Sequence, residues 1–160
     1  THFPRAKRVA FAIVDMVSRK WIDYLVSIEE TSTQVQVVFE QALIAEGLDA
    51  LLVPERLDLD EDDPERPILL ALSDNGPPMA AQDTCDFMTL MAIVQRFGRP
   101  HTPTDQAWVE SFFGHIKSEW SHLEQITDPV ELDRELARVR ADYNGVRLSL
   151  GVPALLRDVA

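Results

Sequence analysis

Three acidic residues stand where their carboxylates could act together on a metal ion. Asp15 lies near the end of an apolar run, Asp74 leads from another apolar run into the turn-forming pair Asn75-Gly76, and Glu110 lies among apolar residues at helical spacing. Converging carboxylates repel one another, and burying them is costly unless a cation compensates. Mg²⁺ prefers oxygen ligands, and two such ions can activate a nucleophile and stabilise a leaving oxygen. If the three side chains converge, they indicate phosphoryl transfer on a phosphodiester.

Asp74 also has a simpler interpretation, because Asp and Asn-Gly are common turn formers. On that interpretation the residue merely opens a turn. A carboxylate that leaves a buried strand is nevertheless held rigidly at its base and open to solvent at its tip, as catalytic carboxylates often are. The choice depends on whether Asp15 and Glu110 lie close to it.

The element that positions Asp15 is a predicted strand. Residues 8–16 are apolar and rich in β-branched and aromatic side chains, which predicts a buried strand with Asp15 near its end. The short connection at residues 17–20 predicts an antiparallel hairpin with a second strand at residues 21–28. A brief third strand at residues 27–31 is a further possibility.

Asp74 is expected to follow a strand that joins this hairpin through a crossover. Hydroxyl residues 31–33 can cap a helix that Gly47 closes, and residues 67–72 form the next apolar run. A strand, a helix and a strand in this order predict parallel pairing of residues 67–72 onto the hairpin. The strand ends would then bring Asp15 and Asp74 together.

Glu110 is expected on a helix at residues 106–125, whose apolar side chains recur every four residues. A preceding helix is predicted at residues 79–95, followed by a mainly irregular segment at residues 97–104. Asp128 and Pro129 predict the start of a last helix, which Asn144-Gly145 should break. If the Glu110 helix docks on the sheet, its carboxylate reaches the edge that carries the other two acids.

Composition limits the kinds of partner and compartment. A chain of 160 residues suits one domain, and its single cysteine, Cys85, excludes an internal disulfide and fits a reducing compartment. No apolar run approaches the roughly 20 residues needed to cross a bilayer. The net charge of −12 counts against unaided DNA binding, because phosphate contacts need Lys and Arg. Residues 55–65 concentrate acidic side chains and predict a solvated loop.

Three motifs resemble the catalytic core of insertion-sequence transposases and retroviral integrases. They are Ile-Val-Asp-Met-Val-Ser-Arg at residues 13–19, Ser-Asp-Asn-Gly at 73–76, and Trp-Val-Glu-Ser-Phe-Phe-Gly-His-Ile-Lys-Ser-Glu at 108–119. Between Asp74 and Glu110 lie 35 residues, the separation typical of that family's second and third acids. Residues 103–107 are similar to its lead-in to the glutamate helix, and residues 143–147 to its C-terminal Tyr-Asn-x-x-Arg element.

The resemblance implies an α/β, ribonuclease H-like fold with a mixed five-stranded sheet and helices on both faces. It implies that Asp15, Asp74 and Glu110 are catalytic and bind two Mg²⁺ or Mn²⁺ ions. The implied activity is that of a DDE-type polynucleotidyl transferase, which cleaves and joins DNA strands in transposition or DNA integration. Residues 1–160 would form a single integrase catalytic core domain.

The resemblance also implies partners. The core would act on DNA, both element ends and target, as a homodimer or higher homo-oligomer, in the bacterial cytoplasm at the nucleoid and without a membrane. Lys117, Asn75 and Arg147 would contact the DNA, although Lys117 equally suits a solvated surface lysine. The chain starts without Met, so we expect a piece of a longer protein from which the N-terminal DNA-binding module is absent.

Two departures from the family pattern leave other functions open. Residues 105–107 read Asp-Gln-Ala where the family has Asp-Asn-Ala, and the Pro-His that usually follows the arginine is missing after Arg147. The second change puts the DNA contacts of the tail in doubt. The alternatives are a hydrolytic nuclease on the same fold, and a degenerate core kept as a dimerisation or scaffolding module, which the acidity favours.

Overall fold

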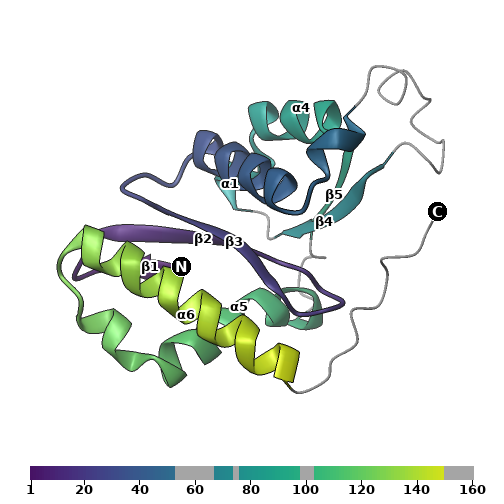
Figure 1. Cartoon of the computed structure of the whole chain (residues 1–160). Helices are drawn as coiled ribbons and strands as arrows, with labels where there is room; N and C mark the ends of the chain where they lie inside the picture. Colours follow the sequence, from purple (N-terminus) through teal and green to yellow (C-terminus); the bar gives the residue numbers. More distant parts are fainter. Residues whose placement is uncertain (53–66, 74–75, 98–102, 150–160) are drawn as a thin grey trace.

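A computed structural model describes residues 1–52, 67–73, 76–97 and 103–149, without the side chains of residues 103–110 and 147–149. Asp74, Asn75 and the acidic segment 55–65 lie outside the described residues. The chain is a mixed α/β fold (Figure 1). Its elements, in chain order, are β1 His2–Phe3, β2 Arg8–Val14, β3 Trp21–Ser27, α1 Ser32–Ala45, η1 Asp49–Leu51, β4 Leu69–Ser73, α3 Pro77–Ala80, α4 Gln82–Leu90, β5 Ile93–Phe97, α5 Pro103–Glu119, η2 Ser121–Gln125 and α6 Pro129–Ser149.

The predicted hairpin is confirmed. β2 pairs antiparallel with β3, from Val9 opposite Ser27 to Val14 opposite Trp21. The register shifts between Ile13 and Val14, which marks a β-bulge close to the turn. β1 adds a short antiparallel pairing on the other edge of β2. Residues 28–31 are not in a strand, so the possible third strand at residues 27–31 is not found.

The single five-stranded sheet is wrong for the described residues, because their strands fall into two sheets. β4 pairs parallel with β5 and not with the hairpin. The edge of β2 at Arg8 and Val9 is instead taken by β1. β4 finds its partner in β5, residues 93–97, of which residues 93–95 fell within the helix predicted at residues 79–95.

Ala92 explains why that predicted helix ends early. Its φ of 51° lies in the left-handed region, which an α-helix cannot continue through. The segment therefore changes from α4 to β5 at this point, whereas the extended Ala81 separates α3 from α4. A short apolar run such as Ile93-Val94 suits a strand or a buried helix equally well, so periodicity alone could not decide.

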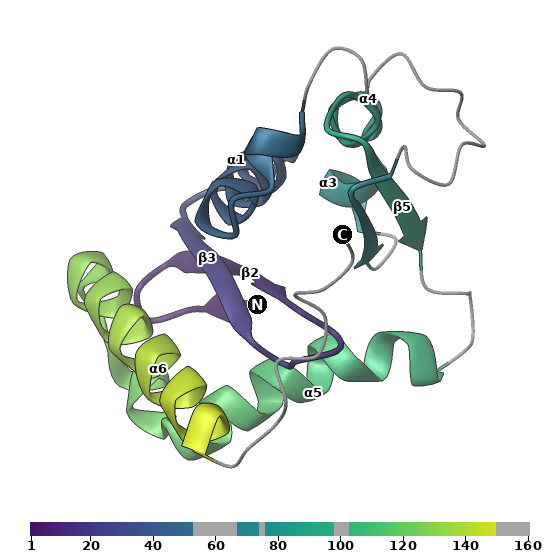
Figure 2. The same cartoon turned by 45° about the vertical axis from the view of Figure 1, so that its right-hand side comes forward.

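Helices cover both faces of the hairpin, as predicted (Figures 1 and 2). Phe11 and Ile13 of β2 pack in a hydrophobic cluster with α1, α4, β4 and β5. Ala10, Ala12 and Val14 alternate to the other face and pack in a second cluster with α5 and α6. The hairpin is therefore shared by two cores, as period-two alternation along a strand requires.

The last two helices differ from their predicted bounds. α5 begins at Pro103 and ends at Glu119, and the 3-10 helix η2 follows it. Asp128 caps α6 as predicted, because its Oδ1 accepts the Val130 N–H at 3.0 Å. The predicted break at Asn144-Gly145 is wrong, since α6 continues to Ser149. None of the helices in the described segments is long and apolar enough to cross a membrane.

Candidate functional site

Asp15 directly follows β2 and organises the turn that joins it to β3. Its backbone closes the turn, because the Asp15 N–H donates to Lys20 O at 2.9 Å and the Arg19 N–H donates to Asp15 O at 2.8 Å. Its carboxylate accepts the Val17 N–H on Oδ1 at 3.1 Å and the Ser18 N–H on Oδ2 at 3.0 Å. The Ser18 hydroxyl also donates to Oδ2. These bonds fix the direction of the half-buried carboxylate.

The electrostatics of the turn keep Asp15 ionised. Partial burial by itself raises the pKa of the carboxyl group. The hydrogen bonds from Ser18 and Val17 and the nearby positive charge of Arg19 lower this pKa, and together they outweigh burial. The net result is a pKa below the ordinary aspartate value. Asp15 is thus a permanent anion at neutral pH.

The helix α5 brings the backbone of Glu110 to the Asp15 end of the hairpin. Phe112, two residues after Glu110, packs edge-on against Trp21 with ring centroids 5.1 Å apart. Trp21 lies opposite Val14, the residue before Asp15. The side chain of Glu110 is outside the described set, so its approach to Asp15 stays a prediction.

Asp74 follows the last residue of β4 and lies outside the described residues. The strand that leads to it is described: Leu69 and Ala71 pack in the same cluster as Phe11 and Ile13 of β2. β4 therefore shares a core with the stretch of β2 that leads to Asp15. Convergence of all three carboxylates also stays a prediction.

An aromatic cluster fixes the relation between the hairpin, α5 and α6. Trp21 is buried and meets Phe112 of α5, Tyr143 of α6 and Tyr24 of β3 in edge-to-face contacts. Phe112 also meets Tyr143, with centroids 5.5 Å apart. Aromatic pairs in this geometry add to the burial of their area. The turn of α5 that carries Glu110 thus adjoins a closely packed aromatic cluster.

Comparison with known families assigns the C-terminal part of the chain. Residues 91–150 match the family model described as integrase core domain. Over these residues the chain is similar to an integrase core domain. The match contains Glu110 and the Tyr-Asn-x-x-Arg element, and Asp15 and Asp74 precede it. Integrase cores are polynucleotidyl transferases that act on DNA and generally use divalent metals. None of the curated proteins compared with the chain matches it.

Among the described residues, Asp15 is the member of the candidate site whose side chain suits a metal ion. Within the described residues, no group of three or more His, Cys, Asp or Glu side chains is placed to hold an ion. That set does not include Asp74 or the side chain of Glu110. Asp15 fits a divalent cation, because it is ionised and its Oδ1 accepts a single hydrogen bond among those described, leaving a lone pair.

Lys117 has a role that neither sequence interpretation anticipated. Its Nζ donates to His2 O at 2.8 Å, lies 3.2 Å from Glu124 Oε1 and stands 4.9 Å from the centroid of the Phe3 ring. His2 pairs with Val9, six residues before Asp15, which places these contacts about 20 Å from Asp15 along the strand. Lys117 therefore holds β1 against α5. A DNA contact by Lys117 stays a prediction.

The two other predicted DNA contacts lie outside the described side chains. Asn75 lies outside the described residues, and Arg147 lies in the last turn of α6 with its side chain outside them. Both stay predictions.

No local sequence signal identified the residues that tie α6 to the hairpin. The side chain of Asn144 bonds both backbone groups of Trp21, and Arg140 forms an ion pair with Asp23 at 2.7 Å. The Tyr24 hydroxyl donates to Asp133 O at 2.9 Å, and burial, aided by the negative Asp133, raises the pKa of Tyr24 to about 12. Asn144 did belong to a recognised motif, but that motif suggested DNA contacts and a helix end.

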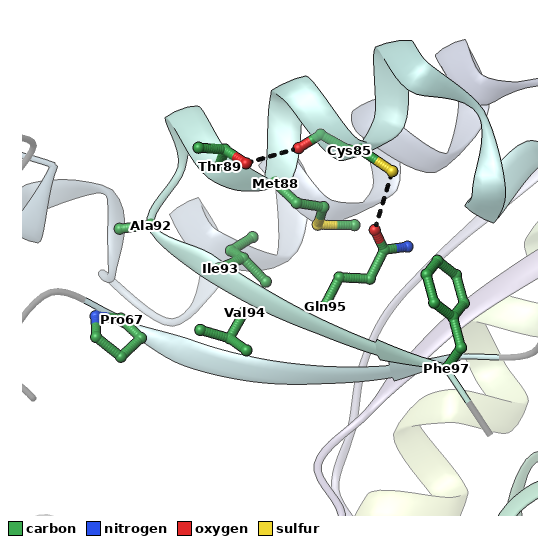
Figure 3. A pocket seen from close by; sticks show the side chains of 9 residues that line it. All are labelled: Pro67, Cys85, Met88, Thr89, Ala92, Ile93, Val94, Gln95 and Phe97. Atoms are coloured by element: carbon green, nitrogen blue, oxygen red, sulfur yellow. Dashed lines mark hydrogen bonds between the residues drawn. The ribbon is translucent and has the colours of Figure 1, made fainter. Parts of the chain in front are cut away.

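Two surface hollows are found among the described residues. A cavity of about 380 Å³ is lined by Pro67, α4 and β5, with the Cys85 thiol and Gln95 facing each other across 3.7 Å (Figure 3). A wider hollow of about 740 Å³ lies between β3 and the start of α6, beside Asp23 and Arg140. Asp15 lines neither of them, and Phe97, which lines the smaller one, pairs with Ser73, the residue before Asp74.

Proposed function

We propose that this integrase core cleaves and transfers DNA strands, with Asp15, Asp74 and Glu110 as a DDE carboxylate triad. The observation that carries the proposal is the integrase core match around Glu110, combined with the contact of Phe112 with Trp21. That contact sets the Glu110 turn of α5 beside the hairpin end from which Asp15 projects. The spacing of Asp74 from Glu110 and the shared core of β4 and β2 support the third member.

Each part of the triad has a distinct task in this proposal. Asp15 offers an ionised carboxylate oxygen, oriented by Ser18 and Val17, and Asp74 and Glu110 complete an oxygen-ligand set that suits two Mg²⁺ or Mn²⁺ ions. Such ions, when bound, supply the positive charge that activates an attacking oxygen and stabilises the departing one. Because the hydrogen bonds of Asp15 are set by the hairpin turn, the ligand is positioned before any ion arrives.

The proposed unit is one catalytic core domain over residues 1–160. The β2–β3 hairpin contributes side chains to both hydrophobic clusters, which supports a single cooperative unit. Assembly into a homodimer or larger homo-oligomer on DNA is part of the proposal by analogy with the family.

A second candidate is a ribonuclease H-like core that serves as an assembly module without catalysis. The net charge of −12 favours it, because the chain would repel DNA phosphates where no cation intervenes. The contacts of Lys117 with His2 and Glu124 also favour the assembly module, because a lysine that bonds within the protein is less available to DNA phosphates.

Nicking and joining of DNA in the presence of Mn²⁺ separate the candidates. A DNA duplex is incubated with the chain, and strand cleavage and joined products are measured on denaturing gels. Asp15→Asn, Asp74→Asn and Glu110→Gln should each abolish both products while circular dichroism stays unchanged. Asp142→Asn, which removes an equal charge from an exposed site on α6, should retain activity.

The outcomes distinguish the three functions. Cleavage without joining, above all on an RNA–DNA hybrid, would indicate a hydrolytic nuclease. A triad variant with normal activity would remove that residue from the site. Absence of any product from the folded parent chain, together with stable self-association, would favour the assembly module.

A further inference from the structure

Asn144 bonds to β3 as a neighbouring strand would. Its side-chain Oδ1 accepts the Trp21 N–H at 2.9 Å, and its Nδ2 donates to Trp21 O at 2.9 Å. One planar amide thus satisfies the donor and the acceptor of the same residue, which is the pattern of a hydrogen-bonded pair in an antiparallel ladder. Figure 2 shows α6 crossing beside β3; Asn144 belongs to α6 and Trp21 to β3.

The contact lies at the irregular end of the hairpin. The register pairs Ile13 with Asp23 and Val14 with Trp21, so Ile22 has no opposite residue on β2. A bulge of this kind leaves backbone groups without ladder partners and increases the local twist. Arg140, one helical turn before Asn144, donates from Nη1 to Ile22 O at 2.9 Å. Two side chains of α6 therefore satisfy the backbone where β2 does not.

A single peptide unit connects Asn144 to Asp15. The peptide between Lys20 and Trp21 donates its N–H to Asn144 Oδ1. Its carbonyl, Lys20 O, accepts the Asp15 N–H at 2.9 Å. Hydrogen bonds in such a series polarise and align one another, so the orientation of this peptide is set from both sides. A rotation of the peptide would move the backbone from which the Asp15 carboxylate projects.

We propose that Asn144 is a positioning residue: through the Lys20–Trp21 peptide it fixes the bulged end of the hairpin, so that the Asp15 carboxylate faces a divalent cation. The fixing of the hairpin end concerns the protein alone, whereas the orientation of Asp15 toward a cation rests on the proposed function. The two residues of the Tyr-Asn element then have different tasks. Tyr143 is buried and packs against Trp21 and Phe112, and the half-buried Asn144 sets the backbone of Trp21.

The chemistry of the contact explains why an asparagine is needed. Aspartate would keep the acceptor for the Trp21 N–H but would set an anionic oxygen against Trp21 O. Serine has one hydroxyl and cannot bond both groups in the same plane. Alanine would leave both backbone groups of Trp21 without these partners. The Lys20 side chain also ties the turn to α1, through Glu46 at 2.6 Å, but that exposed pair contributes little.

The test compares Asn144→Ala and Asn144→Asp with Arg138→Gln in the full chain. Arg138 is exposed on α6 and its described bonds go to Glu135 of the same helix, so its replacement leaves the hairpin untouched. Arg138→Gln also matches the charge change of Asn144→Asp. Three properties are measured by NMR: the hydrogen-exchange rate of the Asp15 amide, the titration midpoint of the Asp15 carboxyl group, and the Mn²⁺ concentration that broadens resonances near Asp15.

In Asn144→Ala we expect the Asp15 amide to exchange about tenfold faster or more, and Mn²⁺ affinity to fall by a similar factor, as for the loss of an outer partner of a metal ligand. The Asp15 midpoint should rise toward the ordinary aspartate value, a change that a loss of global stability alone would not produce. Arg138→Gln should match the parent in all three properties. Asn144→Asp serves where Asn144→Ala does not fold, with the same expected directions.

Unchanged amide exchange and an unchanged Asp15 midpoint in a folded Asn144 variant would overturn the positioning role, even if the parent binds Mn²⁺. Conversely, a parent chain that binds no Mn²⁺ near Asp15 would count against the proposed function. The exchange rate and the midpoint would still decide whether Asn144 positions Asp15. The two proposals therefore fail separately.

Discussion

At Asp15, burial and hydrogen bonding act in opposite directions on one carboxyl group. Burial raises its pKa, and the bonds from Ser18 and Val17 with the charge of Arg19 outweigh that effect. The sequence identified Asp15 through its place at the end of an apolar run, because a strand end is a local signal. The sequence could not show that Asn144 is connected to Asp15 through the Lys20–Trp21 peptide. Trp21 and Asn144, which form the hydrogen bond, are 123 positions apart.

The Ser18 hydroxyl provides a test at this scale. Ser18→Ala removes a hydrogen bond to a charged acceptor and should lower the free energy of unfolding by about 1 kcal/mol at pH 7. The pKa of Asp15 should rise toward its ordinary value. In the parent, folding lowers the pKa of the Asp15 carboxyl group. The ionised carboxylate therefore stabilises the fold at pH values above its unfolded-state pKa, and this stabilisation is lost as the pH falls through its folded-state pKa.

The difference in the free energy of unfolding between Ser18→Ala and the parent should therefore become smaller as the pH is lowered below the ordinary aspartate pKa. Denaturant unfolding at a series of pH values measures it. A difference that stays constant from neutral to acidic pH would mean that the hydroxyl acts elsewhere than on the carboxylate.

Among the elements, those with local start and stop signals were predictable and those that depend on pairing were not. Asp128 and Pro129 fixed the start of α6, and Gly47, with φ of 69°, closes α1 as expected. The partner of β4 depended on Ala92 ending α4, for which the sequence carries no cue. Asn144-Gly145 predicted a helix end, but the Asn144 side chain is bonded to Trp21 instead of its own backbone.

Gly145→Ala tests the course of α6 through this pair. Nothing lies within 4 Å of a Cβ added at Gly145, so alanine should fit the helix and raise the free energy of unfolding by about 0.5–1 kcal/mol. Gly47→Ala is the matched control, because its positive φ should make the same substitution destabilising. Thermal unfolding of both variants gives the signs. Destabilisation by Gly145→Ala would restore the predicted helix break.

Lys117→Met tests the contact between α5 and β1. The variant keeps the apolar stem and removes the ammonium that bonds His2 O and Glu124, so stability should fall by about 1 kcal/mol. Mn²⁺ binding should stay within about twofold of the parent, because Lys117 lies toward the opposite end of β2 from Asp15. A large loss of Mn²⁺ affinity at unchanged stability would place Lys117 at the metal site after all.

At the scale of the whole molecule, the similarity of residues 91–150 to an integrase core domain contrasts with a net charge of −12, because an acidic protein repels DNA phosphates. Composition gives the net charge directly, but it does not show which Lys and Arg side chains form ion pairs within the protein. Several are now seen to be engaged within the protein: Lys117 with Glu124, Lys20 with Glu46 and Arg140 with Asp23. We infer that DNA approaches this core through metal ions or through other parts of an assembly.

DNA affinity with and without a divalent cation tests that inference. At physiological salt and without divalent cations, the chain should bind a DNA duplex more weakly than a Kd of about 10⁻⁴ M, the weak limit of ordinary non-specific binding. Mn²⁺ should strengthen binding in the parent and not in Asp15→Asn. Fluorescence anisotropy of a labelled duplex gives both values. Tight binding in the absence of divalent ions would contradict this inference and indicate a basic DNA-binding surface.

The convergence of Asp15, Asp74 and Glu110 on divalent cations is the claim on which the proposed chemistry depends. Calorimetric titration of Mn²⁺ into the parent and into Asp15→Asn, Asp74→Asn, Glu110→Gln and the control Asp142→Asn tests it most directly. Each triad substitution should weaken binding by about tenfold or more, since loss of a ligand costs at least as much as loss of an outer partner. Asp142→Asn should bind as the parent does. Binding that is equally strong in Asp15→Asn, Asp74→Asn and the parent would contradict the account.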